Sequence, residues 1–210
     1  MEELNRPIPH LINLKELVEE ISEEEVLKIL ESFTCKYNDD VDFFLKSKAI
    51  EFSKRGFATT YLIFLKYKQK MCLVGYFAIA MKTINIYNFS KFSSNYKRKI
   101  SSFCTYDAKL KQHALPLHLI GQLGKNYNAP AEVLKLISRG ELLDLAIDRV
   151  RYIQSLSSGR FVYLECEDVE SLVRFYESKG FVVFDKRYLD KDEKSLFDKK
   201  YLVQLIKFLK

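Results

Sequence analysis

Apolar residues recur at helical spacing along the first quarter of the chain. Between residues 11 and 31 they fall three or four positions apart, which predicts a helix with one apolar face. Ser22 precedes Glu25 at the spacing of a capping box, so a new stretch of helix is expected to begin there. A further helix is expected from residue 38 to about residue 54, with Gly56 at its end.

The pattern then changes to short apolar runs rich in β-branched and aromatic residues, which predict strands. From residue 115 onward the predicted strands alternate with helices, and this order indicates an α/β layer with a partly parallel sheet. The expected strands are residues 58–65, 72–80, 115–123, 161–166, 181–184 and 201–208, and the expected later helices begin at Gly140 and at residue 168.

Residues 84–113 form the least regular stretch of the pattern. From Lys91 to His113 the sequence has six Lys or Arg and one Asp, interleaved with the aromatic residues Phe92, Tyr96, Phe103 and Tyr106. Two interpretations stay open: a solvated loop over the domain, or a segment that contacts a nucleic-acid backbone and stacks on bases.

Composition restricts the class of protein. A chain of 210 residues forms one large domain or two small ones. The four cysteines are widely spaced and have no histidine at ligand spacing, so we expect no metal site and no disulfide framework. No apolar run approaches the roughly 20 residues of a membrane helix, and the acidic N-terminus does not resemble a signal peptide. We therefore expect a cytoplasmic protein that does not bind membranes.

The net charge of +6 is unevenly distributed. Residues 1–31 contain nine Glu and three Lys or Arg, a net charge of −6, which leaves +12 on the rest of the chain. Such a charge favours an anionic ligand, either a nucleic acid or a phosphate-bearing cofactor, without choosing between them.

The segment Phe175-Tyr176-Glu177-Ser178-Lys179-Gly180-Phe181 is predicted to end a helix, turn at the glycine and enter a strand. With the preceding strand, it resembles the x-Φ-Y-E-x-x-G-F signature of the GNAT acetyltransferase superfamily. Residues 34–45 and 74–80 are similar to a branch that includes toxin acetyltransferases acting on aminoacyl-tRNA, together with phage and bacterial relatives. The resemblance covers residues 33–210, so residues 1–32 are expected to be an N-terminal helical extension and residues 84–113 a basic insertion.

The resemblance implies a GNAT-like fold: a mixed, partly parallel central sheet flanked by helices on both faces. It also implies acetyl-CoA as donor and an amine as acceptor. The pantetheine would pair with main-chain groups of Leu119, Ile120, Gly121, Gln122, Leu123 and Gly124, and the pyrophosphate would lie on Ser138, Arg139, Gly140, Glu141 and Leu142. The unpaired amides and dipole of a helix start suit an anion in the same place on physical grounds.

The tyrosine of the signature falls on Tyr176, which the resemblance places to protonate the departing thiolate. A phenol with a pKa near 10 can serve as general acid for a thiol with a pKa of about 8.5. The oxyanion needs a main-chain donor, for which Leu123 and Gly124 are candidates. Direct attack by the amine needs no covalent enzyme intermediate. Glu165, at the carboxyl end of a strand, is a candidate base, and His118 on the neighbouring strand is another.

Two positions depart from the family pattern. The Gln/Arg-x-x-Gly-x-Gly/Ala phosphate loop is not intact, since only Gly140 lies near it, and Val169 stands where the family often has Asn. We therefore predict an acetyl-CoA-dependent N-acetyltransferase, with a catalytically silent GNAT-fold module that binds nucleic acid or a partner protein as the alternative. The acceptor stays open between aminoacyl-tRNA, protein and small amines, and so do a homodimer and an antitoxin partner.

Overall fold

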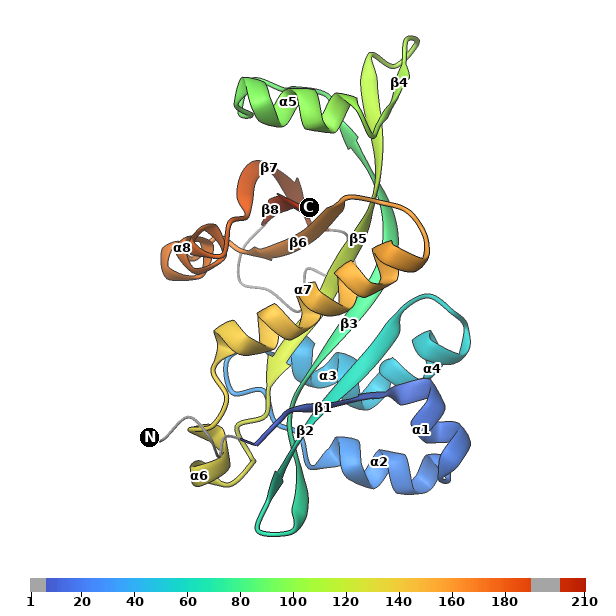
Figure 1. Cartoon of the computed structure of the whole chain (residues 1–210), viewed down its shortest axis with the longest axis vertical. Coiled ribbons are helices and arrows are strands. Elements are labelled where there is room, and N and C mark those ends of the chain that lie inside the picture. The colour runs from blue at the N-terminus through green and yellow to red at the C-terminus, as the bar shows by residue number, and fades with distance from the viewer. Residues whose placement is uncertain (1–6, 190–200) are drawn as a thin grey trace. The chain divides into compact units, whose positions relative to one another are not determined.

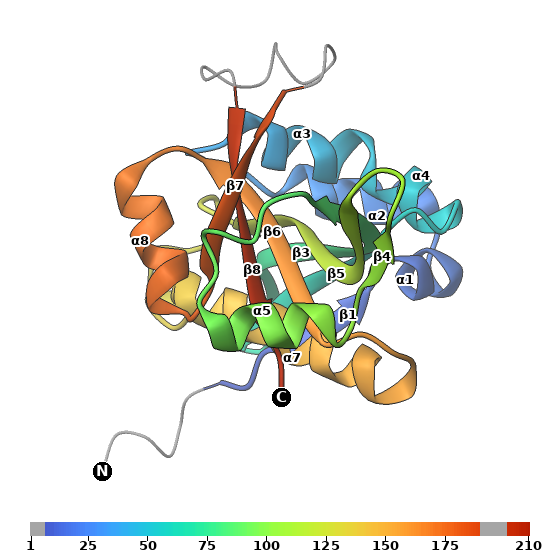
Figure 2. The same ribbon diagram turned by 90° about the horizontal axis from the view of Figure 1, so that it is seen from above.

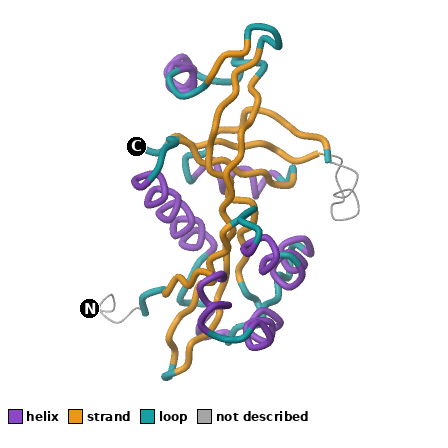
Figure 3. The backbone as a smooth tube through the Cα atoms, turned by 90° about the vertical axis from the view of Figure 1, so that its right-hand side faces the viewer, coloured by secondary structure: helices purple, strands orange, loops and turns teal. Residues whose placement is uncertain are grey.

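The computed structural model describes residues 7–189 and 201–210. The chain divides into two compact units, each made of two segments. Unit 1 comprises Met1–Ala80 and Gly121–Ala146, and unit 2 comprises Met81–Ile120 and Ile147–Lys210. Three long elements contribute residues to both units: β3 (Lys70–Ile86), β5 (Gln112–Lys125) and α7 (Arg139–Leu156) (Figures 1 and 3).

The strands follow the hydrogen-bonded order β1-β2-β3-β5-β6-β8-β7, with β4 paired to β5. Within the described residues, β5 and β6 are registered as a parallel pair, and the registered pairings of β1–β2, β2–β3, β4–β5, β6–β8 and β7–β8 are antiparallel. The mixed α/β class with a partly parallel sheet is therefore confirmed. The remaining strands are β1 (His10–Asn13), β2 (Thr59–Tyr67), β4 (Thr105–Asp107), β6 (Phe161–Glu167), β7 (Val182–Tyr188) and β8 (Tyr201–Phe208).

Unit 1 contains the four N-terminal helices and one later short helix: α1 (Leu14–Glu20), α2 (Glu23–Glu31), α3 (Asp39–Ser47), α4 (Ala49–Lys54) and α6 (Ala131–Leu134). The capping box is confirmed, because the Ser22 side chain accepts from the Glu25 amide and Glu25 accepts from the Ser22 amide. Asn38 caps α3, as expected. The helix predicted over residues 38–54 is interrupted at Lys48, whose φ of −125° leaves the helical region and redirects the chain into α4.

The N-terminal segment is built into unit 1. His10–Asn13 forms strand β1 and pairs with β2, although the sequence pattern predicted helix there. Leu14, Val26 and Leu30 are fully buried in the same apolar cluster as Leu45 and Tyr76. The expected helical extension over residues 1–32 thus supplies, in its described part, a strand and core side chains to the compact unit.

Unit 2 packs α8 (Glu170–Ser178) against β6 and β7 (Figure 2). Its apolar cluster gathers side chains from strands far apart in the sequence, including Leu117, Phe161, Tyr163, Phe184 and Ile206. Gly180 has a φ of +81°, so the turn that joins α8 to β7 uses the backbone freedom that the signature glycine offers. In the described residues, no helix is long and apolar enough to cross a membrane.

The expectation of an irregular segment at residues 84–113 was wrong. Strand β3 continues to Ile86, Ser93 caps helix α5 (Ser94–Ser101), and β4 pairs with β5 (Figure 1). Phe92, Tyr96 and Ile100 recur at a spacing of four residues and face the core of unit 2, where Phe92 is 4% exposed and Ile100 is fully buried. This short helical period was hidden by the basic residues between them.

Candidate functional site

The parallel pairing of β5 with β6 is registered in unit 2, where His118 pairs with Val162 and Leu119 with Tyr163. Strand β5 continues to Lys125, and its residues from Gly121 onward belong to unit 1. Main-chain groups along a strand can hydrogen-bond to an extended ligand in the way that they bind a neighbouring strand.

Two contacts within unit 1 show toward which edge of β5 the main-chain N–H and C=O groups of each residue point. The Asn126 amide donates to the Val74 carbonyl of β3 at 2.9 Å, and a Cβ added to Gly75 would lie 2.7 Å from the Gly124 carbonyl oxygen. Main-chain groups alternate between the two edges of a strand, so those of Gly124 face β3 and those of Leu123 and Gly121 face the opposite edge. Of the two predicted oxyanion donors, this favours Leu123 over Gly124.

The glycine at position 124 has a packing reason. A Cβ there would come within 2.6 Å of Val41 Cγ1 and 2.9 Å of Phe33 Cζ, so a larger residue would displace the core of unit 1. Its neighbour Gln122 donates to the Asp40 carboxylate at 2.8 Å and ties β5 to the first turn of α3. The other predicted pantetheine residues divide by exposure: Ile120 is buried, Leu119 is half-buried and Gly121 is exposed.

The start of α7 carries a second capping box. The Ser138 hydroxyl accepts from the Glu141 amide at 3.2 Å, and the Glu141 carboxylate accepts from the Ser138 amide at 2.7 Å and from its hydroxyl at 2.7 Å. Ser138 and Arg139 are exposed, whereas Leu142 is buried and serves the core. A phosphate on these amides would have to replace the Glu141 carboxylate at the Ser138 amide.

Lys125 is a residue that sequence reasoning did not single out. Its ammonium donates to the Leu134 and Ile137 carbonyls at 2.8 and 2.6 Å and thereby shapes the loop before α7. Burial lowers the pKa of this lysine, and the positive charge of Arg139 lowers it further. Gly140 can be aligned with the last glycine of the family's Gln/Arg-x-x-Gly-x-Gly/Ala pattern. In that alignment, Ser138 stands at the first glycine and Lys135 at the Gln/Arg position.

Tyr176 lies in the last turns of α8 in unit 2 and is half-buried. Its ring packs edge-on against Phe175 at 5.1 Å and Phe181 at 5.9 Å between centroids. Its carbonyl accepts from the Phe181 amide at 3.1 Å, so the glycine turn folds back on the tyrosine and fixes the main chain around it. The helix, turn and strand of the signature are confirmed, and the catalytic role of Tyr176 stays a prediction.

Glu165 is held in a network of polar side chains. Arg187 binds the carboxylate through Nε at 3.0 Å and Nη2 at 2.7 Å, Lys82 pairs with it at 3.3 Å, and the Tyr163 hydroxyl donates to it. Burial alone would raise the pKa of this carboxyl, but the bonds from Arg187 and Tyr163 outweigh it and lower the pKa to about 2. A carboxylate that is so weakly basic does not suit the task of deprotonating an amine, so the geometry favours an anchoring role for Glu165.

His118 is also removed from the solvent. The side chain is 1% exposed, and Gly159 lies over it, since a Cβ there would meet the ring Cε1 at 3.2 Å. Gln154 Nε2 lies 3.4 Å from the ring Nδ1, and Nε2 of the ring has no hydrogen-bond partner among the described residues. Burial lowers the pKa of this imidazole, which makes it a neutral core residue rather than an accessible base.

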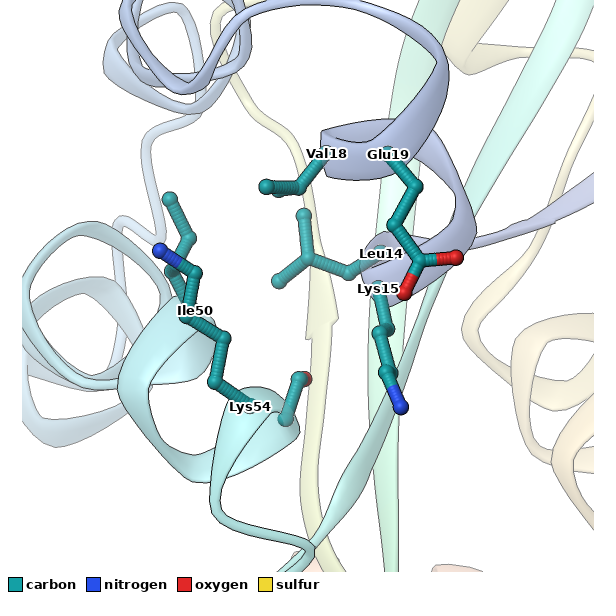
Figure 4. Close-up of a pocket in the computed structure, with 7 residues that line it drawn as sticks. Leu14, Lys15, Val18, Glu19, Ile50 and Lys54 are labelled. Atoms are coloured by element: carbon teal, nitrogen blue, oxygen red, sulfur yellow. The ribbon is translucent and has the colours of Figure 1, made fainter.

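A pocket in unit 1 is lined by none of the predicted site residues (Figure 4). Leu14 and Val18 of α1 face Ile50 of α4 across a space of about 120 Å³, and Lys15, Glu19 and Lys54 surround it. Lys54 pairs with Glu23. The pocket therefore gives no support to the predicted cofactor residues and does not replace them.

Comparison with known proteins gives information at the level of structure. No protein-family model and no curated protein matches the chain. A solved structure of AtaT complexed with acetyl-methionyl-tRNAfMet is 14% identical, covers 93% of this chain and 94% of its own, and superposes with a TM-score of 0.56. A structure of a tyrosine-to-phenylalanine mutant of KacT is 13% identical, with 93% of each chain covered and a TM-score of 0.59.

A structure of AtaTR bound with acetyl-CoA is 14% identical and covers 93% of this chain and 91% of its own, with a TM-score of 0.52. Identities this low relate the folds alone. The mixed sheet, the single registered parallel pair within the described strands and the helix–glycine–strand signature agree with this likeness. The chain therefore has the GNAT-like fold of the AtaT and KacT structures, as its sequence predicted.

Proposed function

We propose that this protein is an acetyl-CoA-dependent N-acetyltransferase that transfers the acetyl group directly to an amine. The observation that carries the proposal is the GNAT-like fold over almost the whole length of the chain. The main-chain groups of Gly121 and Leu123, which face the edge of β5 opposite β3, pair with the pantetheine amides. The exposed Arg139 offers its guanidinium to the pyrophosphate, and the Ser138 amide and hydroxyl donate to it once the Glu141 carboxylate is displaced.

Acetyl-CoA supplies an activated acyl group on a thioester. In the proposed reaction, the amine nitrogen forms a bond to the acetyl carbon while the carbon–sulfur bond breaks. The Leu123 amide donates to the developing oxyanion, and Tyr176 protonates the departing thiolate. The proton that the amine loses passes to water, because Glu165 is tied to Arg187 and His118 is buried.

The first test is binding and turnover of the wild-type protein. Calorimetry with CoA should give a saturable isotherm, and no heat at millimolar CoA from folded protein would refute the proposal. Thiol release from acetyl-CoA should then be measured across a panel of amines.

The second test is Tyr176→Phe, which removes the phenolic proton and keeps the ring packing against Phe175 and Phe181. We expect CoA affinity to be retained and turnover to fall about 10²- to 10⁴-fold, the usual contribution of a general acid. Tyr152→Phe is the matched control, since Tyr152 is an exposed tyrosine of α7. Unchanged turnover in Tyr176→Phe would dismiss Tyr176 as the acid.

For the acceptor, we propose an amine carried on RNA, such as an aminoacyl group. The support is the charge of +6 and two exposed basic residues, Arg98 on α5 and Lys91 just before it, although Lys91 also pairs with Asp185 at 3.7 Å. Phe92 and Tyr96 do not serve base stacking, because both pack in the core and the Tyr96 hydroxyl accepts from the Phe208 amide at 2.9 Å. Acetylation of aminoacyl-tRNA, of peptides and of polyamines should be compared at two salt concentrations, and a preference for peptides or polyamines would refute the RNA acceptor.

One observation favours a second candidate function, a silent GNAT-fold module that binds RNA or a protein. The Glu141 carboxylate accepts a hydrogen bond from the Ser138 amide, the group to which the cofactor's phosphate would bind. A steep salt dependence of RNA binding together with no CoA binding would favour this alternative.

A further inference from the structure

Two tyrosines form an exposed aromatic surface in unit 1. Tyr37 lies between α2 and α3, and Tyr127 follows the end of β5 by two residues. Their rings meet edge-on with centroids 5.0 Å apart. Tyr37 is 68% exposed, which leaves a ring face available to a ligand. Tyr127 is half-buried, and its ring supports the exposed ring of Tyr37 from the side.

The main chain beneath this pair is rigidly held. The Tyr127 amide donates to the Thr34 carbonyl at 2.8 Å, and the Thr34 amide donates to Asn126 Oδ1 at 3.0 Å. Asn126 is 2% exposed and also donates to the Leu73 carbonyl at 2.8 Å. The two loops that carry the rings are therefore joined to each other and to β3, and little conformational freedom is lost when a ligand stacks there.

Positive charge lies next to the pair. The Lys125 ammonium donates to the Ile137 carbonyl at 2.6 Å, so the segment two residues before Tyr127 is tied to the segment two residues before Arg139. Burial raises the pKa of the Tyr127 hydroxyl, and the positive charge of Arg139 acts in the opposite direction, in agreement with this arrangement. Arg139 is exposed. Two of the three acidic groups in the first turn of α3 are engaged, since Asp42 pairs with Lys46 at 2.6 Å and Asp40 accepts from Gln122, and the third, Asp39, is exposed to solvent.

We propose that Tyr37 and Tyr127 form a platform for the adenine ring of CoA and that Arg139 pairs with the phosphates of the same nucleotide. The inference rests on the proposed function, because Arg139 belongs to the predicted pyrophosphate site and the adenosine is joined directly to that pyrophosphate. Aromatic rings beside an arginine suit a purine nucleotide: the ring stacks on the base, and the guanidinium binds phosphate oxygens in a fork.

The experiment compares CoA, adenosine 3′,5′-bisphosphate and acetyl-pantetheine as ligands in calorimetry. Tyr37→Ala should weaken CoA and the bisphosphate by about 5- to 100-fold, the range expected for loss of one base stack. It should leave acetyl-pantetheine, which has no nucleotide, unchanged. Tyr37→Phe keeps the ring and should bind CoA within about twofold of wild type, because the ring stacks on the base and the hydroxyl does not contribute.

The controls address folding and charge. Tyr152→Ala, on α7, removes another exposed tyrosine and should not affect CoA. Arg139→Ala should weaken CoA and the bisphosphate, with partial recovery in Arg139→Lys. All variants should keep the thermal midpoint of wild type, because the mutated side chains are exposed.

The outcomes separate this inference from the proposed function. If wild type binds CoA and Tyr37→Ala binds it equally well, the platform is refuted and the acetyltransferase proposal stands. If wild type binds no CoA, both fail. If Tyr37→Ala leaves CoA binding intact but weakens RNA binding, the pair belongs to an RNA surface and the inference is overturned.

Discussion

Replacement of Glu165 by Gln tests whether this carboxylate anchors unit 2 or acts as the catalytic base. The side chain of Glu165 is 11% exposed and that of its partner Arg187 is 25% exposed. The substitution would keep the size of the side chain but remove the negative charge that Arg187 and Lys82 contact. Breaking a buried ion pair by removing one partner is strongly destabilising, because the other charge stays buried.

The magnitude follows from proton linkage. The network lowers the pKa of Glu165 from an ordinary 4.5 to about 2, and a shift of that size corresponds to about 3 kcal/mol of stability at neutral pH. Because the pKa is lowered in the folded state, this contribution is complete above pH 4.5 and is lost as the pH falls toward 2. For a chain of this length, a loss of about 3 kcal/mol corresponds to a fall of about 6–12 °C in Tm.

The assay is urea unfolding of wild type and Glu165→Gln at pH 7 and at pH 4, followed by acetyl transfer measured well below the lower Tm. We expect the stability difference to be about 3 kcal/mol at pH 7 and smaller at pH 4, with kcat nearly unchanged. Asp148→Asn is the control, since the Asp148–Arg151 pair is exposed and should contribute less than about 1 kcal/mol. Normal stability with a loss of kcat of about 10²-fold or more would show that Glu165 is the base and refute the anchoring argument.

Two further predictions concern packing and pH. Gly124→Ala should destabilise the protein by about 1–3 kcal/mol, because the new Cβ meets Val41 and Phe33. Val41→Ala should relieve part of that cost in a double-mutant cycle measured by urea unfolding, and strictly additive effects would contradict the clash. His118 should make the protein lose stability as the pH falls below 6.5, because burial lowers its pKa in the folded state and the unfolded chain then binds the proton more readily. His118→Gln should flatten the unfolding free energy between about pH 7.5 and 5.5, and equal slopes for both proteins would count against this role.

The elements with strong local signals were predictable from the sequence. The capping box at Ser22, the cap at Asn38 and the turn at Gly180 each depend on residues within a few positions of one another, and the structure confirms them. The interruption at Lys48 and strand β1 were not predictable, because each depends on packing against β2 and the core of unit 1.

The candidate site divides in the same way. The signature around Tyr176 and the start of α7, expected at Gly140 and found at Arg139, were predicted from their own residues. The partners of Glu165 come from positions 82, 163, 187 and 204, so its anchoring and its low pKa could not be inferred from a carboxylate at the end of a strand. The preference for Leu123 over Gly124 likewise depends on which edge of β5 faces β3.

The sequence by itself determined the alternation of strands and helices from residue 115 onward, the charge and the tyrosine signature, because each of these is a property of neighbouring residues. The tertiary structure decided which polar groups bind one another or are buried and which stay exposed to a ligand. It pairs Glu165 with Arg187, places Gly159 over His118, and leaves Tyr37 and Arg139 exposed. Burial and charge pairing act between residues that are far apart in the chain, so they exist only once the fold has formed.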